Sequence, residues 1–279
     1  MPVIKKCLAK HGFKRRKAEK KIRLKNVPGR DEQFGRIAEF KAQYLEAGNP
    51  IISMDTKKKE MQGNFYRDGK LHTSAPIQVN DHDFKSFAEG VVILHGIYDI
   101  QLNKAVINLG TSCDTSEFAC DSLRQWWYSQ GKQDYPHATS ILLLCDGGGS
   151  NGCRQYLFKQ DLQKLVDEIG VEIRVAHYPA YCSKDNPIEH RLFPHVTRAC
   201  QGVVFSSIER VKKCVSGLKR NRGLHVFVNL MTTIYKKGRK VCEHFKMNLP
   251  LIFDNILPKW NYMAIPQNTW LSKLFDFHS

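Results

Sequence analysis

The chain has 279 residues, 42% hydrophobic and 25% charged, so it is long enough for one large domain or two modest ones and can bury a core. Its 43 Lys and Arg against 27 Asp and Glu give a formal net charge of +16, which points to a polyanionic partner, most often nucleic acid. No stretch approaches the ~18 apolar residues of a transmembrane helix and the first ten residues lack the core of a secretory signal, so we expect neither a membrane protein nor a secreted one.

The nine cysteines are odd in number, scattered along the chain and include no C-x-x-C pair. A structural zinc site uses close ligand pairs of that kind, so the cysteines do not predict one. Reduced thiols are typical of cytosolic proteins. We therefore expect a cytoplasmic protein, associated with the nucleoid if its polyanionic partner is DNA.

Most of the excess charge lies near the N-terminus. Residues 1–30 contain twelve Lys and Arg and one acid, which is +11 of the total of +16. The pattern predicts a short amphipathic helix around residues 3–8 and then a basic arm. Each phosphate that such an arm neutralises releases counterions, so Arg15, Arg16 and Lys17 are candidate DNA contacts. A solvated charged tail explains the same composition equally well.

The elements that follow are predicted from hydrophobic periodicity. A helix is predicted over 31–47, where Phe34, Ile37, Phe40 and Tyr44 recur at three- and four-residue steps before Gly48-Asn49-Pro50 ends it. Strands are predicted at 51–55, 91–98, 105–109, 141–144 and 171–175, with a hairpin turn at 99–104 and a long polar loop at 60–90. Further helices are predicted at 114–130, 153–169, 186–200 and 207–218.

This order of elements predicts a mixed α/β fold. Hairpins join antiparallel strands and helical crossovers join parallel ones, so the first three strands are expected to be antiparallel and the last two parallel. The strand at 141–144 is entirely apolar and is expected at the centre of the sheet, covered on both faces. The Trp126-Trp127 pair on an amphipathic helix is expected in the core rather than stacked on DNA bases.

Three acids stand out by their position. Asp55 and Asp146 each close an apolar strand, and Glu189 lies one turn into a predicted helix. The carboxyl end of a buried strand is the edge at which open α/β sheets bind ligands. The glycines at 147–149 would let backbone, metal or substrate approach Asp146 without a Cβ in the way. Taken singly, an Asp at a strand end is better explained as a cap or turn residue, and Glu189 is also explained as a helix-start charge.

Taken together, the three acids indicate a metal site. Converging carboxylates without a cationic partner raise one another's pKa values, and a hard divalent cation relieves this repulsion. Two such ions can activate an attacking oxygen and stabilise a leaving one at phosphorus. The neighbouring Lys57, Lys58, Lys59 and Arg191 would then contact the DNA backbone.

The segments around these acids resemble a known family. Residues 53–60, 145–152 and 186–193 look like the three acidic motifs of a bacterial insertion-sequence family, the Rhodopirellula-type DDE transposases. The resemblance continues at 96–99, 122–127, 235–238 and 260–262, and covers about residues 1–265.

The resemblance implies a fold, a chemistry and a set of partners. The fold would be a ribonuclease-H-like mixed five-stranded sheet flanked by helices. Asp55, Asp146 and Glu189 would be the catalytic triad and would bind two Mg²⁺ or Mn²⁺ ions. The reaction would nick DNA at a transposon end and then join the freed 3′-hydroxyl to target DNA. The expected partners are transposon ends, target DNA and further copies of the chain.

The resemblance also implies a division of the chain and two departures from the family. We expect a basic N-terminal arm and helix at 1–48, the catalytic core at 49–222 and a C-terminal extension at 223–279. Members carry a fuller N-terminal DNA-binding region, so this chain is expected to retain a short basic helical remnant of it. The 179–186 loop also differs, with Asp185 in place of an aromatic residue. A truncated, non-catalytic DNA-binding protein and a nuclease that cleaves without joining stay open as alternatives.

Overall fold

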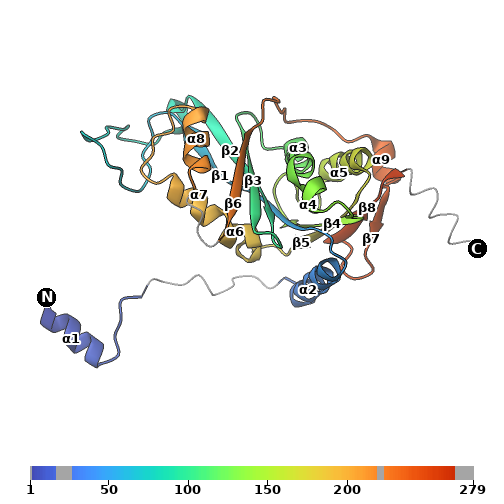
Figure 1. Ribbon diagram of the computed structural model, residues 1–279, viewed down its shortest axis with the longest axis horizontal. Helices are drawn as coiled ribbons and strands as arrows, with labels where there is room; N and C mark the ends of the chain where they lie inside the picture. Colours follow the sequence, from blue (N-terminus) through green and yellow to red (C-terminus); the bar gives the residue numbers. More distant parts are fainter. Residues whose placement is uncertain (1, 17–26, 219–222, 268–279) are drawn as a thin grey trace, which may run out of the picture.

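An eight-stranded mixed sheet forms the centre of the molecule, in the order β6-β3-β2-β1-β4-β5-β8-β7 (Figure 1). The structure is a computed structural model that describes residues 2–16, 27–218 and 223–267. The strands are β1 (Ile51–Gln62), β2 (Gly90–Asp99), β3 (Lys104–Gly110), β4 (Ser140–Asp146), β5 (Glu172–Tyr178), β6 (His225–Leu230), β7 (Leu251–Phe253) and β8 (Asn261–Ala264).

The five predicted strands form the middle of this sheet. β2 is antiparallel to β1 and to β3, whereas β4 is parallel to β1 and to β5. This confirms the predicted mixed α/β sheet, with a meander followed by two crossovers. The predicted count of five was too low, because β6 adds parallel to β3 and the β8-β7 pair adds antiparallel to β5.

The helices are α1 (Pro2–Lys10), α2 (Arg30–Glu46), α3 (Ser116–Trp126), α4 (Lys132–Asp134), α5 (Tyr156–Ile169), α6 (Pro187–Arg191), α7 (Phe193–Ala199), α8 (Ile208–Ser216) and α9 (Glu243–Met247). The helix predicted at 186–200 is broken at Leu192, between α6 and α7, where Pro194 follows at the second position of α7. A single π-helical turn at Trp127–Gly131 extends α3.

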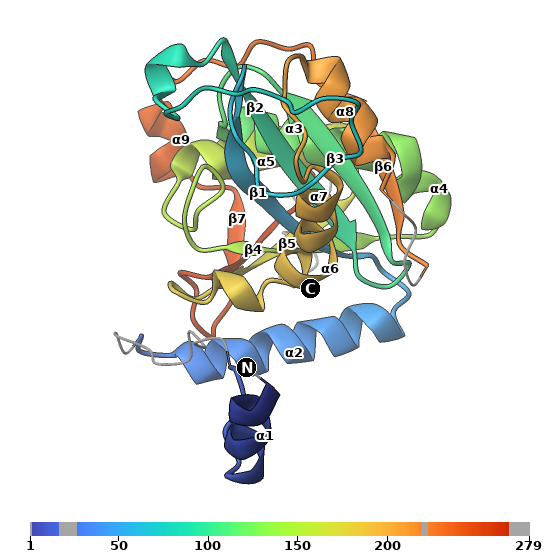
Figure 2. The same cartoon turned by 90° about the vertical axis from the view of Figure 1, so that its left-hand side faces the viewer.

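Different helices cover the two faces of the sheet (Figures 1 and 2). One face packs against α3 and α5 in a core that contains Ile52, Leu143 and the Trp126-Trp127 pair, as predicted for the two tryptophans. On the other face, α6, α7 and α8 cover β2 and β3, and α2 covers β4 and β5. None of the helices in the described ranges has the length and apolarity needed to cross a bilayer.

The strand that carries Asp55 is longer than predicted. Asp55 does not close the strand, because β1 continues to Gln62 as the partner of β2. Its pairing with β4, however, ends at Met54 opposite Cys145. Asp55 therefore lies where the parallel strands β1 and β4 separate. This is the edge of the sheet at which Asp55 was predicted to lie as the last residue of its strand.

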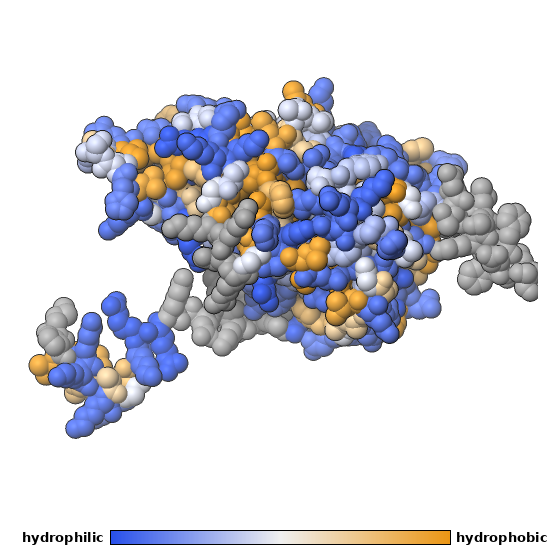
Figure 3. Space-filling model, in the orientation of Figure 1, coloured by the Kyte–Doolittle hydropathy of each residue, from blue (hydrophilic) through white to orange (hydrophobic). Residues whose placement is uncertain are grey.

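Two segments expose apolar side chains. Every described side chain of α1 is exposed, including those of Val3, Ile4 and Leu8. On the face seen in Figure 3, hydrophobic residues gather over β6, an outer strand of the sheet, where Phe227 and Leu230 are exposed. All nine cysteines are free thiols.

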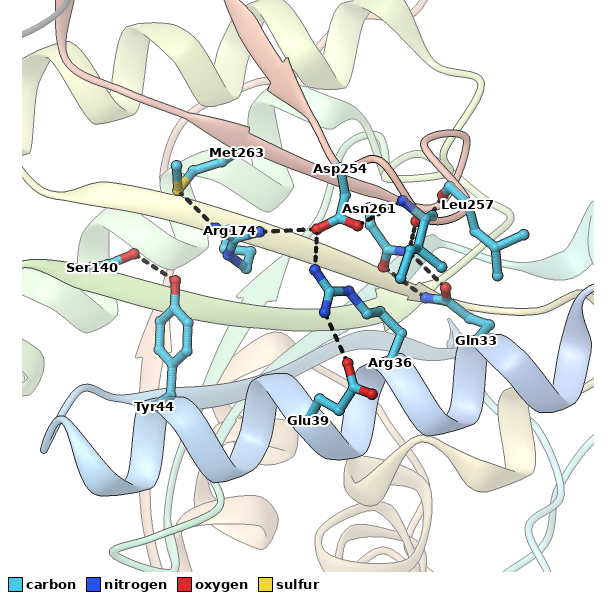
Figure 4. A network of polar contacts seen from close by, with 11 residues as sticks. Gln33, Arg36, Glu39, Tyr44, Ser140, Arg174, Asp254, Leu257, Asn261 and Met263 are labelled. Atoms are coloured by element: carbon cyan, nitrogen blue, oxygen red, sulfur yellow. Dashed lines mark hydrogen bonds and ion pairs between the residues drawn. The ribbon is translucent and has the colours of Figure 1, made fainter. Parts of the chain in front are cut away.

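A polar network attaches α2 to the sheet (Figure 4). The Gln33 amide donates to the backbone oxygen of His177 at 3.0 Å and to Oδ1 of Asn261 at 2.8 Å. Arg36 and Arg174 both approach Oδ2 of Asp254, at 2.6 and 3.5 Å. The predicted helix at 31–47 is thus tied to β5, β8 and the segment between β7 and β8, so its position relative to the site described next is fixed.

Candidate active site

The three acids lie on one face of the sheet. Side chains alternate between faces along a strand, and Leu142 and Leu144 of β4 face α2, so Asp146 points to that same side. Asp55 of β1 shares the face, because Ile52 and Met54 on either side of Ser53 pack into the opposite core. The short helix α6 supplies Glu189 from above this face.

A glycine allows α6 to approach Asp55. Gly96 of β2 is the register partner of Asp55. A Cβ on Gly96 would lie 2.7 Å from Cδ1 of Ile188 and 3.0 Å from Cε1 of Phe193, closer than packed atoms tolerate. The bare backbone at this position therefore lets the segment that carries Glu189 pack directly on the sheet.

The three acids repel one another and, among the described residues, have no cationic partner. Burial, then the charge of Asp146, then Glu189 raise the pKa of Asp55 to about 8. Burial and the charge of Glu189 raise the pKa of Asp146 to about 6, against a hydrogen bond from Asn186 that lowers it. In the described part of the chain no Lys or Arg forms an ion pair with any of the three acids. The cluster is therefore a site of uncompensated negative charge.

Asn186 connects the segments that carry the acids, a role that the sequence did not reveal. Its amide nitrogen lies 3.3 Å from Oδ1 of Asp146 and 3.3 Å from the backbone oxygen of Met54, and its Oδ1 accepts from Ser53 Oγ at 2.5 Å. Ser53 Oγ in turn accepts from the backbone N–H of Ile188 at 3.0 Å. An Asn before Pro at a helix start is normally a cap, yet this side chain makes no cap bond and faces the sheet instead.

His177 supports Asp146 from the opposite side. Its Nδ1 lies 2.9 Å from the backbone oxygen of Asp146, so Nδ1 donates, and Nε2, 3.0 Å from the Tyr262 hydroxyl, accepts. The ring is fully buried, and burial lowers the pKa of His177 to about 4. His177 is therefore neutral at pH 7 and holds the end of β4 without adding charge to the acid cluster.

A fourth acid, Asp114, lies beside the cluster. Its Oδ1 accepts from the Thr56 hydroxyl at 3.3 Å and from the Ser150 hydroxyl at 3.1 Å. Asp114 thus links the residue after Asp55 to the glycine-rich loop after Asp146. Sequence reasoning did not single it out, because it lies in the polar connection before α3 and follows no apolar run.

The residues predicted to contact DNA differ in exposure. Lys57 is largely covered and pairs with Glu60 at 2.6 Å. Lys58 and Arg191 are exposed, and Lys59 is exposed with its Nζ 3.8 Å from Asp114. Arg15 and Arg16 are exposed, and Lys17 lies outside the described residues. DNA contact by this set stays a prediction.

The donor set matches a hard divalent cation. Three carboxylates offer the oxygen ligands that Mg²⁺ and Mn²⁺ prefer, and the cluster lacks positive charge. Burial and the charges of Asp146 and Glu189 raise the pKa of Asp55 to about 8, so Asp55 holds a proton at pH 7. Within the described ranges no three His, Cys, Asp or Glu side chains already stand in the arrangement of a metal site. The residues fit a metal by their chemistry, and the proton would have to leave when it binds.

The sequence as a whole matches one protein family. Residues 1–266 match the family described as the Rhodopirellula transposase DDE domain. The chain belongs to this family. The match spans both the described sheet and the segments that carry the three acids, as the resemblance of the motifs predicted. No protein of curated function matches the chain in sequence.

The DDE domain also has similar solved structures. The Mos1 transposase paired-end complex with the left transposon end is 16% identical, with a TM-score of 0.47 over 76% of this chain and 60% of that chain. The Mos1 mariner paired-end complex with Mn is 16% identical, with a TM-score of 0.48 over 76% of this chain and 61% of that one. The Mos1 strand transfer complex is 15% identical, with a TM-score of 0.49 over 76% and 60%. The chain spans about 60% of the length of these structures.

Proposed function

We propose that this chain catalyses metal-dependent phosphoryl transfer on DNA, cleaving a strand at a transposon end and transferring it to target DNA during transposition of an insertion sequence. Asp55, Asp146 and Glu189 are the catalytic residues. One observation carries the proposal: carboxylates from three distant segments converge on one face of the sheet, and within the described residues no cation neutralises them. Membership of the DDE transposase family supports the same proposed activity.

The three carboxylates would hold Mg²⁺ or Mn²⁺, two ions in the proposed reaction. Such ions activate an attacking oxygen and stabilise a leaving one at phosphorus. The protein itself orients the ligands. Asn186 fixes Asp146 relative to β1, and neutral His177 fixes the backbone at the end of β4. Gly96 lets the Glu189 segment reach Asp55.

DNA is the proposed partner, as transposon end and as target. Lys58, Lys59 and Arg191 are exposed near the acids and would contact the strand at the site, with Lys57 if its pair with Glu60 opens. Arg15, Arg16 and Lys17 would contact the backbone outside the site, in a manner independent of sequence. We propose that the active form is a homo-oligomer and that DNA binding places the protein at the nucleoid in the cytoplasm.

The test uses the purified full chain, duplexes that end in the terminal repeats of its own element, and Mg²⁺ or Mn²⁺. Wild-type protein should nick the intact end and join a pre-nicked end to a target duplex. Asp146→Asn should reduce both rates at least about 10³-fold, because a metal ligand supplies several kcal/mol to the transition state. Asp81→Asn, an exposed acid of the long loop, is the matched control and should act as wild type.

The remaining outcomes separate the alternatives. Cleavage and joining that survive Asp146→Asn contradict the proposal. DNA binding without cleavage of any substrate, with either metal, favours the non-catalytic DNA-binding protein. Cleavage without joining favours a ribonuclease-H-like nuclease.

A further inference from the structure

A basic cavity opens at the carboxyl ends of β4 and β5, on the side of the sheet covered by α5. Its volume is about 600 Å³, within the range of about 300–1,000 Å³ typical of small-ligand pockets. The side chains of Arg154, Tyr156, Lys159, Lys259 and Trp260 line it. Among the described residues that line the cavity there is no Asp or Glu, so the charge of this lining is positive.

Lys159 is the most informative of these residues. It is only 8% exposed, yet no acidic side chain in the described ranges pairs with it. Its Nζ lies instead near three aromatic rings, 5.1 Å from the centroid of Tyr262, 5.4 Å from Tyr156 and 5.5 Å from Phe253. Ring faces attract an ammonium group but do not neutralise it. A buried cation left without an anion is unfavourable, so this arrangement fits a site whose anion arrives from outside.

Two more cations share the cavity. Arg154 is exposed on the loop before α5, and Lys259 is exposed with its Nζ 4.1 Å from the centroid of the Trp260 ring. Neither forms an ion pair with an acid in the part of the chain that the structure describes. The exposed ring of Tyr156 completes the wall. Three unpaired cations beside an accessible aromatic ring match a phosphate that carries an organic group.

The cavity adjoins both segments that carry the acids. Gly147 lines it and directly follows Asp146. Ala180 lines it as well and belongs to the loop that leads from β5 to α6 and Glu189. The cavity therefore opens beside the segments that carry Asp146 and lead to Glu189, at the same end of the sheet as the acids.

We propose that this cavity binds a phosphodiester of the DNA strand that is engaged at the acids, with the phosphate on Lys159 and Arg154 and the adjoining sugar and base against Tyr156. This inference rests on the proposed function. A free phosphate would satisfy the cations alone, but it would leave the exposed part of the Tyr156 ring in contact with water.

The experiment measures DNA binding without catalysis. Fluorescence anisotropy of a labelled, pre-nicked transposon-end duplex is recorded in EDTA at several NaCl concentrations, with the full chain and its variants. Lys159→Met keeps the apolar stem of the side chain and removes its charge. Arg154→Gln changes an exposed side chain, so this variant should fold as the wild type does. Lys164→Gln, an exposed lysine of the same helix that does not line the cavity, is the control.

Both cavity variants should weaken binding about 3- to 10-fold and lower the slope of log K against log salt by about one, while Lys164→Gln keeps the wild-type values. Wild-type affinity and slope in Arg154→Gln and in folded Lys159→Met overturn the proposal and leave the proposed function standing. If calorimetric titration shows that sodium phosphate binds the wild type but not Lys159→Met, and phosphate at matched ionic strength leaves the DNA affinity of the wild type unchanged, the cavity binds free phosphate and the proposal fails. Absence of both DNA binding and cleavage in the wild type rejects the proposed function together with the cavity.

Discussion

The contact between α2 and the sheet differs from the acid cluster in how its charges are paired. At α2, Arg36 and Arg174 share the largely buried carboxylate of Asp254. Around Gly147, by contrast, three acids lie on one side without a cation and three cations lie on the other without an acid, among the residues described. The chain pairs its charges where a helix has to be attached, and leaves them unpaired at the two places where we propose that a metal and a phosphate bind.

The pKa values of the acids follow this difference. Burial acts to raise the pKa of Asp254, but the hydrogen bond and charge of Arg36, with the charge of Arg174, lower it below its usual value. Burial raises the pKa of Asp55 as well, and there the neighbouring Asp146 and Glu189 raise it further. The same residue type is thus stabilised as an anion in one region and destabilised as an anion in the other.

Removing a paired charge should give the largest loss of stability. Asp254→Asn should lower the free energy of unfolding by about 2–3 kcal/mol, because Arg174 would lose its anion and Arg36 would keep only its pair with the more exposed Glu39. Urea unfolding at pH 7 measures this change. Asp81→Asn should match the wild type. An unchanged midpoint for Asp254→Asn would mean that the α2 contact does not depend on this ion pair.

Removing the residue that orients an acid should act on the reaction. Asn186→Ala should slow strand cleavage about 10- to 100-fold, the range for residues that position metal ligands. Asn108→Ala is the matched control, because Asn108 is also fully buried and hydrogen-bonded but lies in β3, away from the acids. If Asn186→Ala and Asn108→Ala lose the same cleavage rate in proportion to their loss of stability, Asn186 only stabilises the fold and does not position Asp146.

Removing an unpaired charge should give a gain of stability, on the order of 1–2 kcal/mol. The pKa of Asp55 is raised in the folded state, so folded metal-free protein holds this proton more tightly than the unfolded chain does. Wild-type stability should therefore fall as pH rises from about 4 to 8, and Asp55→Asn should escape part of this fall. Melting temperatures in EDTA at pH 5 and pH 8 measure it. If Asp55→Asn is less stable than the wild type at pH 8, Asp55 is not destabilised by repulsion from Asp146 and Glu189.

The sequence predicts those parts of the fold and site that depend on the residue pattern of a single segment. The apolar runs that end near Asp55 and Asp146 gave the strands, and the spacing of Phe34, Ile37 and Phe40 gave α2 with its buried face. The tryptophan pair gave the core between α3 and α5. Each of these features depends on the periodicity of a single stretch, which is visible without the rest of the fold.

The remaining features depend on contacts between distant segments. β6 and β7 were not predicted, because their apolar runs at 226–228 and 251–253 are only three residues long and both strands are partly exposed. Asn186 stands at the N-cap position of α6, and only the packing of this helix over β1 and β4 directs its amide to Asp146. Two of the aromatic rings around the Lys159 ammonium, those of Phe253 in β7 and Tyr262 in β8, lie about a hundred residues further along the chain. No pattern within a single segment predicts contacts between residues so far apart in the sequence.

The most direct test of the metal site is a calorimetric titration of the metal-free chain with Mn²⁺ at pH 7.5, in buffers of different ionisation enthalpy, with Asp146→Asn and Glu189→Gln alongside. The account predicts that the wild type binds Mn²⁺ with release of protons and that each variant binds at least about tenfold more weakly. Equal affinity and equal proton release in the wild type and both variants would contradict the claim that Asp55, Asp146 and Glu189 form a metal site.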